Sequence, residues 1–341
     1  MKYFKGSIIF TIICLIVAFL WAHFMSPGHE LQALFIVVVL SVLEVGFSFD
    51  NAVVNAVKLE KMTPIWQHRF LTWGIIIAVF GMRFLFPILI VAIFSRLNLL
   101  AVISMAIQNP DSYTHYLQIS HPPIITFGGC FLMMLALNYF FNYKKQVHWI
   151  KFLEKPMSLL GEVKGLNAFI TLLVLSLANN YVPLLYKTDV IIAGLWGVVV
   201  YLIVEGVSSF LEKKEAIMEA DDIKRNCLMN FIYLELIDAS FSLDGVLGAF
   251  ALSKDVFIIT IGLAIGAMFV RSLTIAFVEK KTLKQYIFLE HGAHWAIATL
   301  AIIMFISSFR EVNEVLTGFL GLIFIVVAFV CSIVHNKKQN V

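Results

Sequence analysis

The stretch LEVGFSFDNAVV, residues 43–54, places a glutamate, an aspartate and an asparagine inside a long apolar run. The composition of the whole chain indicates whether that run lies in lipid or in a soluble core. Hydrophobic residues make up 60% of the 341 residues and charged residues only 14%, whereas soluble domains carry roughly 25% charged residues. With a mean hydropathy of +0.91, the chain is predicted to be a polytopic membrane protein.

Apolar stretches of roughly 18–25 residues, separated by polar breaks, predict about ten transmembrane helices and therefore an all-α membrane helix bundle. Segment 95–122 is left open, because its apolar part LNLLAVISMAI is too short to span and fits a re-entrant or interfacial piece. The spans are expected near residues 7–25, 31–57, 70–94, 123–142, 166–186, 189–211, 228–252, 255–278, 286–308 and 312–334.

The basic residues give these spans an orientation. Of the 25 lysines and arginines, nineteen fall at one set of alternate helix ends and loops and four at the other set. Basic residues gather on the cytoplasmic side of membrane proteins. We therefore expect a multi-pass protein of the cytoplasmic membrane with both termini in the cytoplasm. The remaining two basic residues, Arg83 and Arg271, fall inside predicted spans.

The opening stretch has a partner later in the chain. LEVGFSFDNAVV aligns with IDASFSLDGVLG, residues 237–248, so that Glu44 matches Asp238 and Asp50 matches Asp244. In each copy an arginine follows on the next span, nine residues after a glycine (WGIIIAVFGMR and IGLAIGAMFVR). The two aspartate-bearing helices are five spans apart and therefore cross the membrane in opposite directions. This pattern predicts an inverted-topology repeat, with a substrate site near the bilayer midplane.

The acidic residues of this repeat are candidate cation ligands. A charge at the bilayer centre costs at least about 2.5–3.5 kcal/mol on insertion scales. Spans 31–57 and 228–252 carry five acids against two intramembrane arginines. An arginine could pair with Asp50 or Asp244 and simply lock two helices together, but the surplus acids predict a bound cation, either a metal ion or protons.

Helical spacing arranges these groups. Glu44, Ser48, Asn51 and Asn55 form one polar stripe, and Glu235, Asp238, Ser242 and Gly245 form its partner. Asp50 and Asp244 lie off their stripes. Either the helices are unwound near Gly46–Ser48 and Gly245, or each aspartate has a second partner. Oxygen donors favour Mn²⁺, Mg²⁺ or Ca²⁺, and His291 and His294 could add nitrogen ligands.

These motifs resemble those of the TerC superfamily, in which an E-x5-D-N motif faces an E-x2-D-x5-D motif on an inverted helix. The resemblance covers roughly 31–142 and 226–310 and implies a three-plus-three core related to lysine-exporter-like transporters. The superfamily is associated with manganese export, with metal supply to secreted enzymes and with tellurite resistance. Gly245 stands where many relatives carry a serine. The implied metal ligands are Glu44, Asp50, Asn51, Glu235, Asp238 and Asp244, supported by Ser48, Asn55, Arg83, Ser242, Arg271, His291 and His294.

The resulting division of the chain has five parts. We expect an N-terminal transmembrane helix in 1–30, a first core repeat in 31–142, a cytoplasmic loop with two linking helices in 143–225, an inverted second repeat in 226–310, and a C-terminal helix and tail in 311–341.

The expected function is transport of a divalent cation, with manganese export favoured and proton coupling allowed. The substrate would be the metal ion, with no prosthetic group and no nucleic acid, and the chain could form a homo-oligomer. The alternative is an accessory protein that supplies metal to secreted proteins or docks to secretion machinery through 143–165 and 212–225. An enzyme is not expected, since the motifs of intramembrane aspartyl proteases and zinc proteases are absent.

Overall fold

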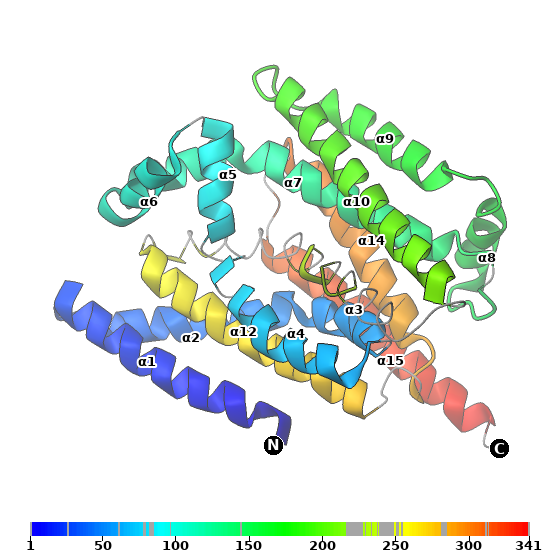
Figure 1. Cartoon of the computed structure of the whole chain (residues 1–341), viewed down its shortest axis with the longest axis horizontal. Coiled ribbons are helices and arrows are strands. Elements are labelled where there is room, and N and C mark those ends of the chain that lie inside the picture. Colours follow the sequence, from blue (N-terminus) through cyan, green and yellow to red (C-terminus); the bar gives the residue numbers. More distant parts are fainter. Residues whose placement is uncertain are drawn as a thin grey trace.

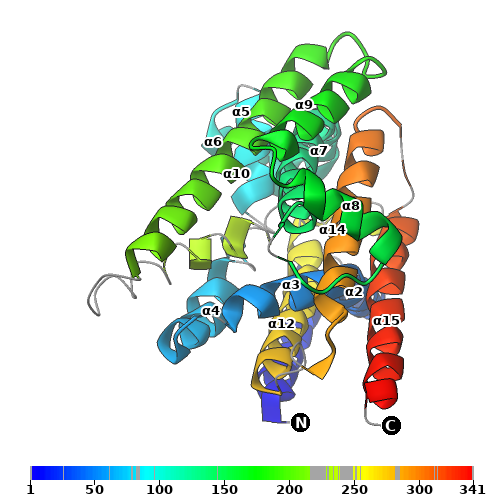
Figure 2. The ribbon, with the colours of Figure 1, turned by 90° about the vertical axis from the view of Figure 1, so that its right-hand side faces the viewer.

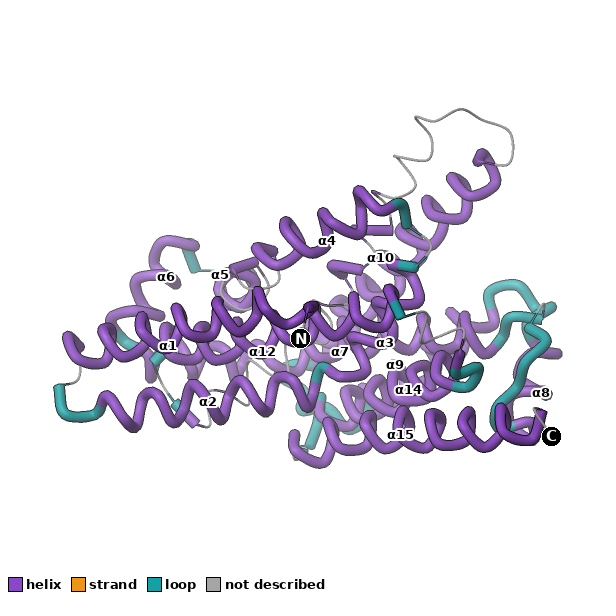
Figure 3. Tube along the Cα trace, turned by 90° about the horizontal axis from the view of Figure 1, so that it is seen from below, coloured by secondary structure: helices purple, strands orange, loops and turns teal. Residues whose placement is uncertain are grey.

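The fold is described from a computed structural model of the chain. It describes residues 2–25, 27–60, 62–77, 80–81, 85–95, 97–143, 145–215, 228, 230–232, 234–236, 238, 249, 252–253, 255–280, 285–310, 312 and 314–339. Within these ranges the chain forms helices joined by turns and loops, without a strand (Figure 3). The helices are η1 (Lys2–Phe4), α1 (Lys5–Met25), α2 (Glu30–Phe47), α3 (Phe49–Leu59), α4 (Pro64–Ile76), α5 (Phe86–Ser95), α6 (Leu99–Gln108), α7 (Pro110–Phe140), α8 (Lys151–Leu160), α9 (Leu166–Asn179), α10 (Lys187–Glu215), α12 (Val256–Glu279), α14 (Leu289–Ser307) and α15 (Glu314–Gln339).

Six helices of the described part are long and apolar enough to cross a membrane, namely α1, α7, α10, α12, α14 and α15. The bent pair α2–α3 raises this number to seven if it counts as one span. These helices indicate an all-α membrane protein, as the composition predicts. The count of ten spans stays a prediction.

Three predicted segments differ in detail from the observed helices. The predicted span 70–94 overlaps the end of α4 and most of α5, and the predicted span 166–186 contains the 14-residue α9. Segment 95–122 forms α6 and the first part of α7. The early start of α7 has a local cause. Asn109 accepts a hydrogen bond from the Ser112 amide at 3.3 Å, and Pro110 occupies the first helical position.

Burial separates central helices from peripheral ones. The apolar window of α7 is 83% buried and that of α12 is 67% buried, against 17% for α1 and 22% for α15. In a membrane protein a peripheral helix can expose apolar side chains, because lipid tails are as apolar as they are. Thus α7 and α12 form the interior of the bundle, and α1 and α15 lie at its edges (Figure 1).

The helices α2 and α12 run parallel and in close contact. A Cβ atom added at Gly262 would lie 2.7 Å from the Leu40 Cβ, and one at Gly266 would overlap the side chain of Glu44. The Ser41 hydroxyl also donates a hydrogen bond to the Gly262 carbonyl at 3.0 Å. Two small residues four positions apart allow membrane helices to approach in this way.

By contrast, α7 and α14 run antiparallel. Gly129 of α7 lies against Met304 near the end of α14, while Phe140 at the end of α7 packs on Trp295, with ring centroids 4.6 Å apart. The α2–α12 and α7–α14 pairs are therefore oriented as the predicted alternation of spans requires. The repeat itself stays a prediction, because most of its second acidic helix lies outside the described residues.

Both ends of the chain lie at one end of the bundle (Figure 2). Ser7 in α1 forms a hydrogen bond with Ser272, near the end of α12, at 2.7 Å. Asn336 in α15 donates to the Gln285 carbonyl, just before α14, at 2.7 Å. The side of the membrane on which this end lies stays a prediction.

The opening stretch is a broken helix. Between α2 and α3 the helix axis bends by 48°, and Ser48 is the residue at the break. The Ser48 backbone N–H still bonds to the Glu44 carbonyl at 2.9 Å, and its hydroxyl donates to Glu44 Oε1 at 2.9 Å. A local break near Gly46–Ser48 was one of the two alternatives that the sequence left open.

Candidate cation site

The polar stripe of the opening stretch lies in the protein interior. Glu44 is 2% exposed, Ser48 6%, Asn51 5% and Asn55 1%. These residues belong to two helices with different axes, with Ser48 at the break between them, and yet all four side chains are buried. Of the other predicted residues, the Asp50 side chain, Arg83, Ser242 and Asp244 lie outside the described part of the chain.

Arg271 of α12 binds two acids of the second motif. Its Nη2 atom donates to Asp238 Oδ2 at 2.9 Å and to the Glu235 carboxylate at 3.2 and 3.3 Å. Its Nη1 atom donates to the Phe70 carbonyl at 2.9 Å, and the guanidinium carbon lies 4.2 Å from the Phe70 ring centroid. Arg271 is only 2% exposed, so this cation and its two carboxylates are held together away from the surface.

Asn55 links the first stripe to this ion pair. Its Nδ2 atom donates to Asp238 Oδ1 at 2.7 Å. Asn55 Oδ1 and Arg271 Nε are buried and form no hydrogen bond with any residue that the structure describes. Asn55, at the end of the buried stripe, therefore contacts the ion pair directly, while Glu44 and Ser48 bond to each other at the other end of the stripe.

Two glycines make room for these groups. A Cβ atom at Gly74 of α4 would overlap the Arg271 guanidinium and would lie 2.7 Å from Glu235 Oε1. Gly266 of α12 does the same for the Glu44 side chain, since a Cβ there would overlap the Glu44 Cβ and Cγ atoms. The charged side chains occupy space that any larger residue would fill.

The charge balance of this cluster favours a cation. Among the described interior residues, Glu235 and Asp238 share the one guanidinium of Arg271, and the Glu44 carboxylate accepts a hydrogen bond from Ser48. No three His, Cys, Asp or Glu side chains in the described part of the chain are close enough together to hold a metal ion. The Asp50 side chain and Asp244, both predicted ligands, are not among these described groups. The residues present supply carboxylate and amide oxygens, which suit hard divalent cations.

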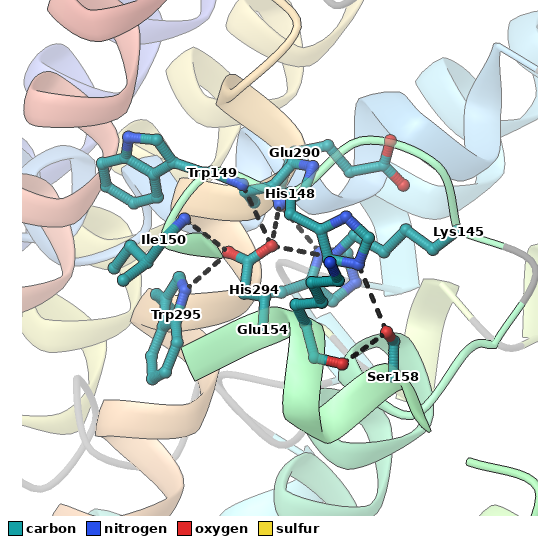
Figure 4. A network of polar contacts seen from close by, with 11 residues as sticks. Lys145, His148, Trp149, Ile150, Glu154, Ser158, Glu290, His294 and Trp295 are labelled. Carbon is teal, nitrogen blue, oxygen red and sulfur yellow. Dashed lines mark hydrogen bonds and ion pairs between the residues drawn. The ribbon is translucent and has the colours of Figure 1, made fainter. Parts of the chain in front are cut away.

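His294, at the start of α14, belongs to a different polar cluster (Figure 4), and His291 joins the same cluster through Glu154. His291 Nδ1 lies 2.7 Å from Glu154 Oε2, and the Trp295 indole donates to Glu154 Oε1 at 3.0 Å. His294 Nδ1 lies 2.8 Å from the Glu290 carbonyl oxygen. These contacts tie both histidines to groups other than the predicted cation ligands.

Glu154 was not singled out from the sequence. It is fully buried, and it also accepts hydrogen bonds from Lys145 Nζ at 3.2 Å and from the Trp149 and Ile150 amides at 3.1 and 3.4 Å. In the sequence it stands among lysines in a predicted cytoplasmic loop, where an acid usually faces water. The available signal was its spacing, because Glu154 and Ser158 share one helix face while Phe152 and Leu159 share another.

The chain matches a known protein family. A family model described as "Protein of unknown function (DUF475)" matches residues 49–339, from the start of α3 to the end of α15. No curated protein and no solved structure matches the chain. The matched range contains Asn51, Asn55, Glu235, Asp238 and Arg271 and leaves Glu44 just outside.

Proposed function

The chain belongs to the DUF475 family, and we propose a function for it from its own residues: transport of a divalent cation across the membrane, with Mn²⁺ export as the favoured case. The observation that carries the proposal is the set of interior polar groups: the buried stripe Glu44, Ser48, Asn51 and Asn55, and the ion pair of Arg271 with Glu235 and Asp238 that Asn55 contacts. A charged side chain at the bilayer centre costs at least about 2.5–3.5 kcal/mol on insertion scales. Three acids and one arginine in the interior are therefore expected to have a functional purpose.

The broken helix supports the same function. Discontinuous helices in transporters place unwound backbone and helix ends beside the ion near the membrane midplane. The break at Ser48 lies between two buried polar residues, Glu44 and Asn51. Carboxylate and amide oxygens from this region and from Asp238 would line the path of the ion. The proposed ligand set is Glu44, Asp50, Asn51, Glu235, Asp238 and Asp244.

Arg271 has a specific role in this proposal. When no metal ion is bound, its guanidinium offsets one of the two negative charges of Glu235 and Asp238 at hydrogen-bonding distance. The empty site then carries less uncompensated charge, which lowers the cost of burial. An arriving cation would compete with Arg271 for these carboxylates. Protons that bind the same carboxylates after the metal ion leaves would be transported in the opposite direction. Rocking of one half of the bundle against the other would open the site to alternate sides.

The proposed export of manganese, the location in the cytoplasmic membrane with cytoplasmic termini, and the relationship to the TerC superfamily form one hypothesis. The oxygen ligands are compatible with Mn²⁺, Mg²⁺ and Ca²⁺ alike. Only the resemblance of the two acidic motifs favours manganese among them. The choice of ion is therefore part of the test.

The test is metal uptake into inside-out vesicles with Mn²⁺, Mg²⁺, Ca²⁺ or Zn²⁺, with and without a proton gradient. We expect manganese uptake above that of vesicles lacking the protein. The substitutions Glu44→Gln, Asp50→Ala, Asp238→Asn and Asp244→Ala should each lower it toward that background, while Glu162→Gln, at an exposed acid in a loop, should not. Uptake of no ion by the wild type, or unchanged uptake by all four variants, would contradict the proposal.

A further inference from the structure

The short helix α8 buries its acidic side chain and exposes its large apolar ones. Its only acidic residue, Glu154, is completely buried, whereas Phe152 is 86% exposed and Leu159 68% exposed. Leu153 and Leu160 are also exposed, at 43% and 50%. A helix on a protein in water would place Phe and Leu inward and Glu outward. The outer face of α8 therefore requires an apolar environment.

The rotation of α8 about its axis is fixed by the Glu154 contacts. The carboxylate is held by His291 and Trp295 of α14, by Lys145, and by two backbone amides of the preceding loop. At the far end of the helix, a Cβ atom at Gly161 would overlap the Phe141 carbonyl oxygen. Both ends of α8 are thus anchored, so the outward position of Phe152 and Leu159 belongs to the folded structure.

The apolar face of α8 continues into a predicted membrane segment. After a short turn, α9 begins at Leu166 and exposes Phe169 (64%), Leu173 (48%) and Leu177 (55%). Between the two helices lies exposed Val163 (57%). Because apolar side chains are exposed from α8 to α9, the environment that covers α9 is expected to cover the outer face of α8 as well.

Charged side chains border this apolar face. Lys151 and Lys155 of α8 and Lys164 in the following turn are exposed, and Glu162 is the one exposed acid in residues 151–165. The α8 helix also lies beside the start of α14, at the end of the bundle where both chain termini are found. An apolar face with lysines at its edge is typical of helices that lie in the surface of an anionic membrane.

We propose that α8 is an interfacial helix that lies flat in the anionic leaflet surface, with Phe152, Leu153, Leu159 and Leu160 in the acyl region and Lys151, Lys155 and Lys164 at the lipid headgroups. Such helices sit about 5–10 Å into the boundary between headgroups and acyl chains. The contacts of Glu154 with α14 fix the rotation of α8 so that its apolar face points outward. This proposal depends on a membrane environment and is independent of metal transport.

The test places a fluorescent probe on α8 in the full-length protein. The native cysteines are replaced, Phe152→Cys is introduced and labelled with an environment-sensitive dye, and the protein is reconstituted in vesicles of equal parts phosphatidylcholine and phosphatidylglycerol. Gln146→Cys, in the exposed loop before α8, is the matched control. We expect a blue-shifted emission at position 152 and several-fold stronger quenching by acyl-brominated lipids than at position 146.

Two further variants separate the parts of the proposal. In the labelled Phe152→Cys protein, Lys151→Gln with Lys155→Gln should reduce the difference in quenching between anionic vesicles and pure phosphatidylcholine vesicles. Glu154→Gln should weaken the quenching in both kinds of vesicle, because α8 is no longer held in its rotation. Circular dichroism and elution as a single species establish that each variant is folded.

The proposal is wrong if the probe at position 152 is as accessible to aqueous quenchers as the probe at position 146. It is also wrong if position 152 is shielded in native membranes but exposed in vesicles of purified protein and lipid. In that case a protein partner covers α8. Neither result depends on whether the protein moves manganese, so failure of the transport assay leaves this measurement unaffected.

Discussion

Arg271 holds together a cluster of charges whose burial inside the bundle costs free energy. It is 2% exposed and is shared between Glu235, Asp238 and the Phe70 carbonyl. Removing one partner of a buried ion pair leaves an uncompensated charge, which is strongly destabilising. The same guanidinium is therefore expected to matter for stability as well as for the proposed site.

Replacing Arg271 should destabilise the protein. We expect Arg271→Gln to lower the thermal midpoint of the purified protein by an amount that corresponds to about 3–5 kcal/mol. Arg271→Lys should recover part of this loss, since a lysine keeps the charge but cannot make the forked contacts. Arg310→Gln, at an exposed arginine, is the control. An Arg271→Gln midpoint equal to that of the control would show that the ion pair does not stabilise the fold.

Glu154 predicts a pH dependence of stability. Burial alone would raise the pKa of its carboxyl group, but the hydrogen bond with His291, the neighbouring His291 and Lys145 charges and the Trp295 hydrogen bond lower the pKa from 4.5 to about 2. Because the folded-state pKa lies below the unfolded one, the ionised carboxylate stabilises the fold fully above about pH 4.5. This contribution, about 3 kcal/mol by linkage, is lost as the pH falls from about 4.5 to 2.

Glu154→Gln gives the corresponding measurement. The difference in thermal midpoint between wild type and this variant should be largest above about pH 5 and should shrink as the pH is lowered through about 4. Glu162→Gln, at an exposed acid, should show only a small difference at every pH. A difference for Glu154→Gln that stays constant down to about pH 3 would contradict the assigned ionic role.

At the scale of the elements, the contact between α2 and α12 depends on glycines. Gly266→Ala should destabilise the protein by about 1–3 kcal/mol, because the added Cβ would overlap the Glu44 side chain and lie 2.9 Å from the Ser41 carbonyl oxygen. Gly206→Ala in α10 is the matched control, since nothing lies within 4 Å of a Cβ there. It should leave the thermal midpoint unchanged or raise it slightly, as alanine favours helix over glycine. Equal midpoints for the two variants would show that the close approach is dispensable.

The elements also show where sequence reasoning succeeds and where it stops. The 3.6-residue spacing placed Glu44, Ser48, Asn51 and Asn55 on one stripe, and the structure buries all four. Hydropathy did not predict where α4 ends or where α5 begins, because apolar composition alone does not mark the end of a helix. Asn109 and Pro110, by contrast, are local signals that mark the start of α7.

Contacts between distant segments could not be read from local patterns. The sequence left open that an intramembrane arginine pairs with Asp50 or Asp244, which lie outside the described side chains, and it did not reveal the contacts of Arg271 with Glu235 and Asp238. Which acid an arginine reaches depends on how two helices cross, and their spacing along the chain does not encode that. The link between Glu154 and His291 joins positions 137 residues apart, so it was equally hidden.

For the whole molecule, the relative directions of the helices predict which positions face the same side of the membrane. The contacts place Gln285 and both chain termini at one end of the bundle, and the α1–α2 turn and the end of α14 at the other. Positions His29 and Arg310, both exposed, should therefore share a side that Gln146 and Gln285 do not. In a cysteine-free background, His29→Cys and Arg310→Cys should react with a membrane-impermeant thiol reagent in intact cells.

The same labelling also decides the absolute orientation that we propose. If the lysine-rich end is cytoplasmic, Gln146→Cys and Gln285→Cys should react only after the cells are permeabilised. Reversed labelling of all four positions would keep the fold and place the termini outside, because the relative directions come from packing while the orientation comes from the basic residues. Labelling of His29→Cys and Gln285→Cys from the same side is the outcome that the helix packing forbids, because α2 and α12 run parallel and the chain reaches Gln285 only after α12 has crossed the bundle.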